Sequence, residues 1–182
     1  MENDISIRPV ANEDLEMIRN WRNSPEVSQY MYTEPFISKE DQIAWFTKIS
    51  ADPTCKYLVV EYEGKPLGLL YFTEISKTFD SCFWAFYLGD TSVRGAGIGT
   101  KIEYNALSYI FDTLKLNKLR CEVLINNEKV IKMHEKFGFR REAYYREHVK
   151  KKDVYYDVVG LAMLRREWEM LKDYHFNRIY NR

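Results

Sequence analysis

The chain has 182 residues, of which 46% are hydrophobic and 30% charged, with only 8 Gly and 5 Pro. This composition excludes a disordered or low-complexity chain, and a domain of this length buries roughly 70% of the surface that its unfolded chain exposes. Lys plus Arg equals Asp plus Glu at 27 each, so no overall charge draws the protein to nucleic acid or to an anionic membrane, and any anion site must be local.

The sequence has no apolar run near 20 residues and no basic segment leading into an apolar one at its start. We therefore expect a cytoplasmic protein with neither a membrane nor a nucleic acid as partner. Its three cysteines are odd in number and lack C-x-x-C spacing, which favours buried reduced thiols. Its three histidines are scattered without ligand partners nearby in sequence, so no metal is expected.

The first predicted elements are one strand and two helices. Residues 5–10 alternate between apolar and polar and predict a strand, after which Asn12 is expected to cap a helix. Asn-Ser-Pro at 23–25 ends that helix. Ser38 and Asp41 stand at the two positions of a capping box, which predicts the start of a second helix.

Three apolar runs follow, at 57–62, 67–75 and 82–88, and a turn sequence at 63–66 makes them an expected antiparallel meander. A crossover helix then joins the run at 82–88 to a further strand, so these two strands should be parallel neighbours. The remaining predicted elements are a helix at 98–114, a strand at 118–125, a helix at 127–137 closing at Gly138, strands at 139–148 and 154–163, and a helical tail at 165–174.

Arg94, Gly95, Gly97 and Gly99 lie in the turn between the strand at 82–88 and the next helix. The first turn of a helix leaves backbone N–H groups unpaired and carries partial positive charge, so a phosphate can bind there. A tight turn whose glycines serve only packing is the alternative. Three strands precede this turn, which excludes a dinucleotide-binding unit, and no Gly-Lys-Ser/Thr triplet follows, which excludes a Walker A loop.

Two motifs resemble those of the GCN5-related N-acetyltransferase (GNAT) superfamily. Arg94, Gly97 and Gly99 match its pyrophosphate motif of Arg or Gln, two residues, Gly, one residue, then Gly or Ala. Residues 127–139 match its second motif of Asn, a short amphipathic helix and a terminal Gly-Phe. The order of predicted elements also agrees, over residues 5–165.

The resemblance implies the α/β (α+β) GNAT fold, in which a mixed sheet of about seven strands splays between two parallel central strands and carries about four to five helices. It divides the chain into a GNAT acetyltransferase domain at 1–165 and a C-terminal helical tail at 166–182. It also implies acetyl-CoA as co-substrate, held in the cleft between the splayed strands, and no metal.

The same resemblance implies which residues contact acetyl-CoA. The expected backbone contacts are Leu88, Gly89, Arg94, Gly95, Gly97, Ile98, Gly99 and Thr100, and the expected side-chain contacts are Asn127 and Lys136. A solvated position on a helix face is the alternative for Lys136.

Acetyl transfer to an amine needs a proton acceptor, because alkyl amines hold their proton up to about pH 10, and a proton donor for the departing thiolate. Glu122 lies on a predicted strand and is the expected general base; a salt bridge with Arg120 or Lys118 is the alternative. His134 stands where related enzymes carry a tyrosine as general acid, and packing within the helix is its alternative. The other candidates for the acid are Tyr144, Tyr145, Tyr155 and Tyr156.

The region of this sequence before the predicted meander is rich in aromatic residues. The GNAT resemblance implies that this region forms the wall of the acceptor site. Arg22, Met31, Tyr32 and Trp45 are the expected substrate-binding residues, because flat rings and a guanidinium suit a base and a diphosphate. Core packing is the alternative for many of these rings. The segments at 21–27 and 31–38 also resemble the bacterial N-acetyltransferases that modify a UDP-linked 4-amino-4,6-dideoxy sugar in pseudaminic acid synthesis.

Three hypotheses follow for the function. The first is an N-acetyltransferase acting on the 4-amino group of a UDP-linked amino-deoxy sugar, by direct attack in a ternary complex. The second keeps the enzyme class but takes a protein N-terminus or a polyamine as acceptor. The third, suggested by the missing tyrosine, is a non-catalytic acetyl-CoA-binding module. The expected partner is a small-molecule amine, and a homodimer is compatible with this class.

Overall fold

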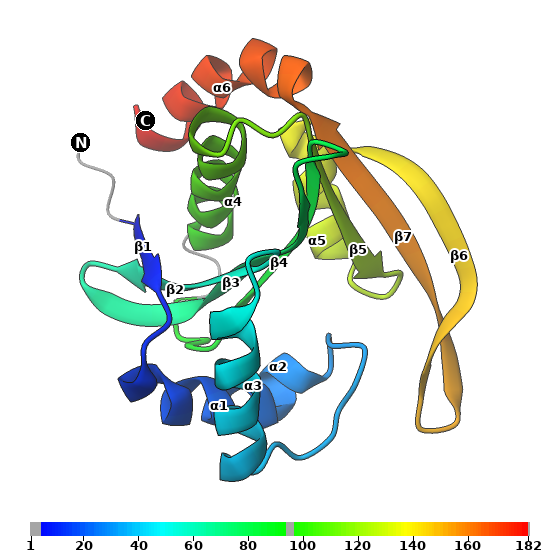
Figure 1. Ribbon diagram of the computed structural model, residues 1–182. Helices are drawn as coiled ribbons and strands as arrows, with labels where there is room; N and C mark the ends of the chain where they lie inside the picture. The colour runs from blue at the N-terminus through cyan, green and yellow to red at the C-terminus, as the bar shows by residue number, and fades with distance from the viewer. Residues whose placement is uncertain (1–4, 94–96, 182) are drawn as a thin grey trace.

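Seven strands of the described chain form one mixed sheet, in which sequence order and spatial order differ (Figure 1). The computed structural model describes residues 5–93 and 97–181. The strands are β1 (Ile5–Pro9), β2 (Lys56–Tyr62), β3 (Lys65–Ser76), β4 (Ser81–Leu88), β5 (Lys118–Leu124), β6 (Arg140–Lys151) and β7 (Val154–Leu164). Their spatial order is β1-β2-β3-β4-β5-β7-β6, and β2, β3 and β4 form the antiparallel meander that the apolar runs predict.

Among the described strands, β4 and β5 are the one parallel pair, as the crossover helix predicts. They are paired only at their beginnings, from Ser81 opposite Lys118 to Phe83 opposite Arg120. Beyond this point β4 stays paired with β3, and β5 stays paired with β7, so the two central strands separate. The edge of β4 that faces β5 therefore presents backbone N–H and C=O groups that no neighbouring strand uses.

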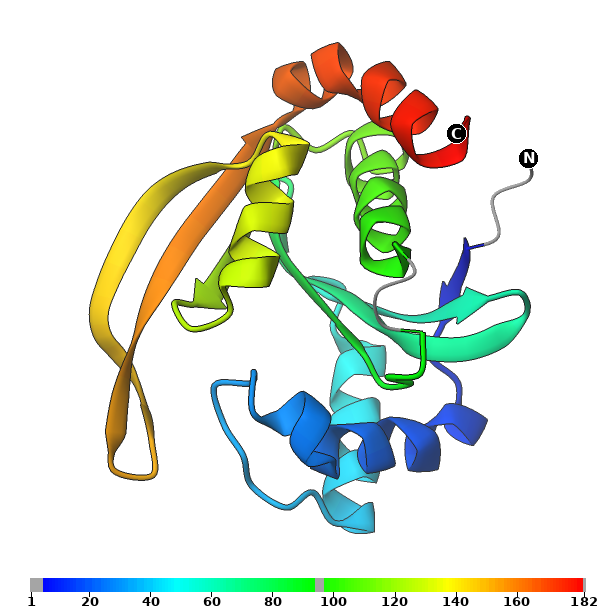
Figure 2. The same cartoon turned by 180° about the vertical axis from the view of Figure 1, so that it is seen from behind.

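Helices cover both faces of the sheet (Figures 1 and 2). One face carries α1 (Leu15–Asn23), α2 (Pro25–Ser28) and α3 (Lys39–Ala51), and the other carries α4 (Ile98–Ser108), α5 (Glu128–Phe137) and α6 (Arg165–Tyr180). The described chain thus has six α-helices where about four to five were expected. The additional helix is α2, a single turn that begins at a proline, where the missing backbone N–H costs nothing.

Side-chain alternation along the sheet separates two hydrophobic cores. Trp84 on β4 faces α4, α5 and α6 and belongs to the larger core, whereas Tyr87 faces α1 and belongs to the smaller one together with Ile18. Trp168 of α6 is completely buried in the larger core, so the C-terminal helix packs as part of the same body. The functional division of the chain at residue 165 stays a prediction.

The helix starts show one confirmed cap and one wrong expectation. Ser38 caps α3 as predicted, because its Oγ accepts from the Asp41 N–H at 3.0 Å while Asp41 accepts from the Ser38 N–H at 3.1 Å. Asn12, however, lies inside a 3₁₀ turn (Asn12–Asp14) and does not cap α1. Asp14 stands at the N-cap position of α1 but makes no side-chain cap hydrogen bond to that helix. Its carboxylate accepts from the Ala11 N–H at 2.8 Å, and its hydrogen bond from Arg8 holds its pKa below the usual range.

Within residues 5–93 and 97–181, no helix has the length and apolar character needed to cross a membrane. The same part of the chain holds no group of three or more His, Cys, Asp or Glu side chains placed to bind a metal ion. Cys82 and Cys121 are buried free thiols, and Cys55 is a half-exposed one.

Candidate active site

A cleft of about 850 Å³ lies where β4 and β5 separate. It passes through the sheet, from the face covered by α4 and α5 to the face covered by α1 and α2; we call these the α4–α5 half and the α1–α2 half. The lining residues come from both, and they include the run Phe83–Leu88 of β4 and the run Cys121–Leu124 of β5. Alternation along β5 turns Cys121 toward the α4–α5 half and Glu122 toward the α1–α2 half.

The α4–α5 half holds the N-terminus of α4. Gly97 precedes the helix with φ of +77°, a left-handed conformation that glycine adopts without strain. Gly97, Gly99 and Thr100 all line the cleft, and a Cβ at Gly99 would be in van der Waals contact with the Met133 Sδ at 3.4 Å. The Thr100 N–H is donated to the Gly97 carbonyl at 3.1 Å, and the rest of the first turn of α4 opens onto the cleft, where an anion can bind. Arg94 and Gly95, also predicted here, lie outside the described residues.

The other predicted cofactor contacts are placed in different ways. Leu88 lines the cleft at the open edge of β4, and Asn127 lines it at the start of α5. Ile98 lines it too, but its side chain is 1% exposed and packs in the core, which leaves its backbone for contact. The Gly89 N–H is already donated to the Leu67 carbonyl at 3.0 Å, and Gly89 is not among the lining residues.

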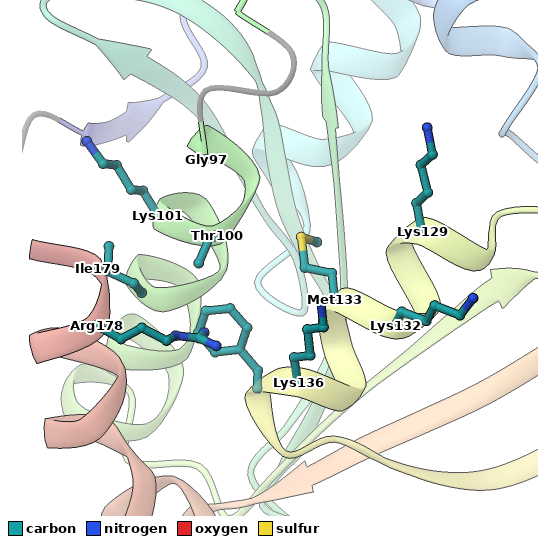
Figure 3. A pocket seen from close by; sticks show the side chains of 10 residues that line it. Gly97, Thr100, Lys101, Lys129, Lys132, Met133, Lys136, Arg178 and Ile179 are labelled. Carbon is teal, nitrogen blue, oxygen red and sulfur yellow. The ribbon is translucent and has the colours of Figure 1, made fainter. Parts of the chain in front are cut away.

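A second cavity of about 480 Å³ continues from Gly97 between α4 and α5 and is strongly basic (Figure 3). Its cationic lining residues are Lys101, Lys129, Lys132, Lys136 and Arg178. Lys136, a predicted contact, is one of them. Lys129, Lys132 and Lys136 share one face of α5 by their spacing, a signal present in the sequence. Arg178 extends from α6 over the Phe137 ring at 5.4 Å, which no local pattern reveals.

Glu122 is hydrogen-bonded to a residue far away in sequence. The Tyr32 hydroxyl donates to the Glu122 Oε2 at 2.8 Å. The cations considered as alternative partners are engaged elsewhere, because Arg120 pairs with Glu74 and Lys118 pairs with Glu142. Glu122 therefore stands in the cleft as a carboxylate hydrogen-bonded to a tyrosine, and burial together with this carboxylate raises the Tyr32 pKa.

His134 lines the floor of the cleft and is 3% exposed. Its Nδ1 lies 2.7 Å from the Oε1 of Glu103, a completely buried carboxylate on α4 that the sequence analysis did not single out. Burial by itself lowers the pKa of His134, but the neighbouring Glu103 carboxylate and, after it, Cys121 outweigh burial and raise that pKa well above the ordinary value. None of the tyrosines considered as other candidate acids lines the cleft: Tyr144, Tyr145, Tyr155 and Tyr156.

Three of the four predicted substrate-binding residues line the α1–α2 half: Arg22, Met31 and Tyr32. Trp45 does not, because its ring packs edge-on against Tyr57 at 5.1 Å. The Nη1 of Arg22 is buried and has no hydrogen-bond partner among the described residues. The hydroxyl of Tyr87, a cleft residue that is 7% exposed, also has no hydrogen-bond partner among the described residues. Its place on an apolar strand gave no signal of a functional role.

Lys151 fixes the wall of the α1–α2 half from the far end of β6. Its Nζ donates to the Gln29 carbonyl at 2.6 Å and to the Ser28 carbonyl at 3.3 Å, and it pairs with Glu34 at 2.8 Å. The side chain is only 9% exposed. These contacts join the segment after α2 to the β6–β7 hairpin, and because they span more than 110 residues of sequence, local patterns could not predict them.

Residues 4–140 match the family model described as an acetyltransferase (GNAT) domain. The chain belongs to the GNAT acetyltransferase family, consistent with its splayed central strands and the glycine at the start of α4. It is an acetyl-CoA-dependent N-acetyltransferase, a class to which its named relatives also belong.

Two relatives and two solved structures describe the neighbourhood of the chain. The acetyltransferase PseH of Campylobacter jejuni is 28% identical over 128 residues, covering 70% of this chain and 78% of the relative. The spermidine N(1)-acetyltransferase of Escherichia coli K12 is 28% identical over 138 residues, covering 76% and 74%.

Among solved structures, the spermidine N-acetyltransferase of Vibrio cholerae in complex with CoA and spermine superposes with a TM-score of 0.87, at 25% identity, covering 92% of this chain and 99% of the other. A dodecameric structure of that enzyme in an intermediate state gives a TM-score of 0.79 at 25% identity, covering 92% and 97%.

Proposed function

We propose that this N-acetyltransferase acts on a primary amine carried by an anionic small molecule, most specifically the 4-amino group of a UDP-linked amino-deoxy sugar. The observation that carries the proposal is the Arg22 guanidinium, which lies in the α1–α2 half of the cleft and whose buried Nη1 has no hydrogen-bond partner within residues 5–93 and 97–181. The similarity to PseH, at 28% identity, supports the same acceptor class.

An unpartnered guanidinium N–H is costly to bury, because it loses water without gaining a hydrogen bond. The Tyr87 hydroxyl beside it has the same deficit, and both groups can donate. A phosphate oxygen accepts from both at once, and a diphosphate suits the planar fork of an arginine. Tyr30, an exposed ring that lines the same half, offers a surface on which a base can stack.

A polyamine is the second candidate acceptor, and two observations favour it. Glu26 and Glu122 both line the cleft, and carboxylates suit a polycation. The spermidine acetyltransferases of E. coli and V. cholerae are about as similar to this chain as PseH is. Against it, a polycation in this cleft would meet the positive charge of Arg22 at close range, which is unfavourable in a partly buried site. A protein N-terminus, also a primary amine, is the third candidate acceptor.

For acetyl-CoA we propose contacts on both cavities. The open edge of β4 near Leu88 pairs with the pantetheine amides. The first turn of α4 at Gly97, Gly99 and Thr100 holds the pyrophosphate, and the Asn127 side chain also contacts the coenzyme. The basic cavity beside Lys136 holds the remaining phosphate of the coenzyme. The donor set fits, because in the described part of the chain every charged side chain that lines this second cavity is a cation.

For the reaction we propose direct attack of the amine on the acetyl group in a ternary complex. Glu122 accepts the proton of the amine, directly or through one water, and Tyr32 orients its carboxylate. His134 donates the proton that the departing sulfur takes up. Assembly as a homodimer stays a prediction, beside a similar enzyme described as dodecameric.

The acceptor is tested by comparing turnover on a UDP-linked 4-amino-4,6-dideoxy sugar, spermidine and a peptide with a free N-terminus, for the wild type and for Arg22→Gln. For the sugar nucleotide we expect KM to rise about tenfold or more in the variant, since a hydrogen bond to a charged group contributes about 1.5–3 kcal/mol. Arg19→Gln, on the same helix but outside the cleft lining, is the matched control and should leave KM unchanged.

The two main candidate acceptors predict opposite changes in the acceptor KM of Arg22→Gln. If spermidine is the true acceptor, removal of the like charge at Arg22 lowers its KM. The sugar-nucleotide proposal is overturned if spermidine has the highest kcat/KM and its KM falls in Arg22→Gln.

A further inference from the structure

We propose that Glu103 is a positioning residue for the acetyl transfer: its buried carboxylate holds His134 as an imidazolium, oriented with one N–H left to protonate the departing sulfur. This inference rests on the proposed role of His134 as the general acid. It adds a group on α4, completely shielded from solvent, that touches neither substrate and acts only through His134.

The contact with Glu103 engages one of the two ring nitrogens of His134. Glu103 Oε1 lies 2.7 Å from Nδ1 of His134, so Nδ1 is committed to the carboxylate and Nε2 is the nitrogen that Glu103 does not engage. The Cys121 thiol is the second hydrogen-bonding neighbour of the ring. Trp84 packs edge-on against the imidazole at 5.3 Å and Phe139 packs against it at 5.2 Å, which fixes the plane of the ring. The ring lines the cleft just where β4 and β5 separate.

The charges around His134 leave Glu103 as its ionic partner. From α4 the imidazole meets Glu103, and from β5 it meets the thiol of Cys121. Trp84 of β4 and Phe139 after α5 bring no charge. The Glu103 carboxylate has no exposed surface, and within the described chain His134 is the side chain placed to neutralise its negative charge. The imidazole does so only when it is protonated.

Packing alone does not account for such a pair. A buried ion pair contributes little net stability, and apolar residues of similar size often stabilise a core as well or better. Ionisable groups whose protonation is shifted by a specific charged neighbour are concentrated at reactive sites. Here the shifted group stands at the position where the GNAT resemblance expects the acid, and a neutral imidazole would be a poorer proton donor than an imidazolium.

The proton balance of the step is complete within the site. The amine nitrogen forms a bond to the acetyl carbon while the carbon–sulfur bond breaks and its electron pair stays on sulfur. Glu122 takes the proton from nitrogen, and the Nε2–H of His134 goes to sulfur. The products are the amide and the free thiol, and both side chains then return to their starting protonation states by exchange with solvent.

The test compares wild type with Glu103→Gln, an isosteric change that keeps an oxygen acceptor for Nδ1–H and removes the charge. In ¹⁵N NMR spectra of the whole protein at pH 8, His134 should be an imidazolium in the wild type and neutral in the variant. The ratio of wild-type to variant kcat should rise from about twofold at pH 6 to about tenfold or more at pH 8.5, because the variant loses its acid as pH rises past the ordinary histidine range. The dissociation constant of acetyl-CoA should stay within about twofold.

His175→Gln is the matched control. His175 is also buried, and its Nε2 lies 3.1 Å from the Phe137 carbonyl, outside the cleft lining. This variant should lower the midpoint of thermal unfolding without changing how kcat depends on pH. The double variant Glu103→Gln with His134→Tyr should lose the pH-dependent part of the Glu103 effect.

Two results overturn the proposal: a neutral His134 in the wild type at pH 8, or a kcat ratio that is constant from pH 6 to 8.5. The first is measured on the wild type, so it holds even if the variant fails to fold. The kinetics use whichever amine of the panel turns over. A polyamine acceptor would therefore overturn the proposed substrate while leaving this test intact, and a flat ratio with the sugar nucleotide would overturn only the role of Glu103.

Discussion

The two halves of the cleft are built in different ways. The α4–α5 half and the basic cavity beside it come mainly from two continuous segments, the turn into α4 and helix α5, and carry positive charge. The α1–α2 half draws on α1, the segment after α2, β4 and β5, with Lys151 of β6 anchoring its wall. Its lining contains both the guanidinium of Arg22 and the carboxylates of Glu26 and Glu122.

This difference matches the two ligands that the halves serve in the proposed reaction. A coenzyme that all members of a family share can be held by backbone geometry and a few cations, which short motifs encode. An acceptor that differs between members has to be recognised by side chains on elements free to vary, brought together only by the fold.

The largest expected effect is in the α4–α5 half. Gly97→Asp places a negative charge at the first turn of α4, where the proposed pyrophosphate lies, and should weaken acetyl-CoA binding by about 100-fold or more, as two like charges at one helix end repel. Isothermal titration calorimetry measures the dissociation constant, and circular dichroism checks that the variant is folded.

Gly64→Asp is the control that separates charge from backbone strain. Gly64 has φ of +74°, nearly the same as Gly97 at +77°, and no atom lies within 4 Å of the site of its Cβ. Both substitutions strain the backbone alike, but only the one at Gly97 lies in the cleft. Equal losses of acetyl-CoA affinity in the two variants would contradict the phosphate site.

A large effect on kcat, with none on acetyl-CoA binding, is expected at Glu122. Glu122→Gln removes the proposed base and should lower kcat by ~10²-fold or more while leaving the acetyl-CoA dissociation constant unchanged. Thiol release under saturating substrates measures kcat. Glu142→Gln, which removes a surface carboxylate paired with Lys118, is the control and should have wild-type activity. An unchanged rate in Glu122→Gln would return Glu122 to a structural role.

The smallest effect is expected from the wall of the α1–α2 half. Lys151→Met removes the contacts to Ser28, Gln29 and Glu34 and should raise the acceptor KM by about tenfold. A hydrogen bond to a charged group stabilises by about 1.5–3 kcal/mol, and its loss leaves the wall of the acceptor half less well held. The acetyl-CoA dissociation constant should not change. Lys150→Met, its exposed neighbour, is the matched control. Equal changes in both constants would show that the two halves are not independent.

The site illustrates what a sequence pattern can and cannot supply. Glu122 was identifiable as a carboxylate on an apolar strand and His134 from the GNAT resemblance, but their partners were not, because Tyr32 and Glu103 are 90 and 31 residues away. Trp45 shows the reverse error: an aromatic residue in the right segment packs against Tyr57 and faces away from the cleft. Helical spacing identifies a buried face without saying whether a core or a ligand lies against it.

The sequence by itself determined the order of the strands along the chain and the parallel central pair, because periodicity and turn residues are local properties. The resemblance of two short motifs to the GNAT superfamily implied the fold class and the coenzyme. Only the tertiary structure decided where β4 and β5 separate, which cations border Gly97, and which groups stand beside Arg22 and His134. Those depend on side chains from distant segments meeting in a partly buried cleft, where the loss of water makes each pairing or missing partner energetically decisive.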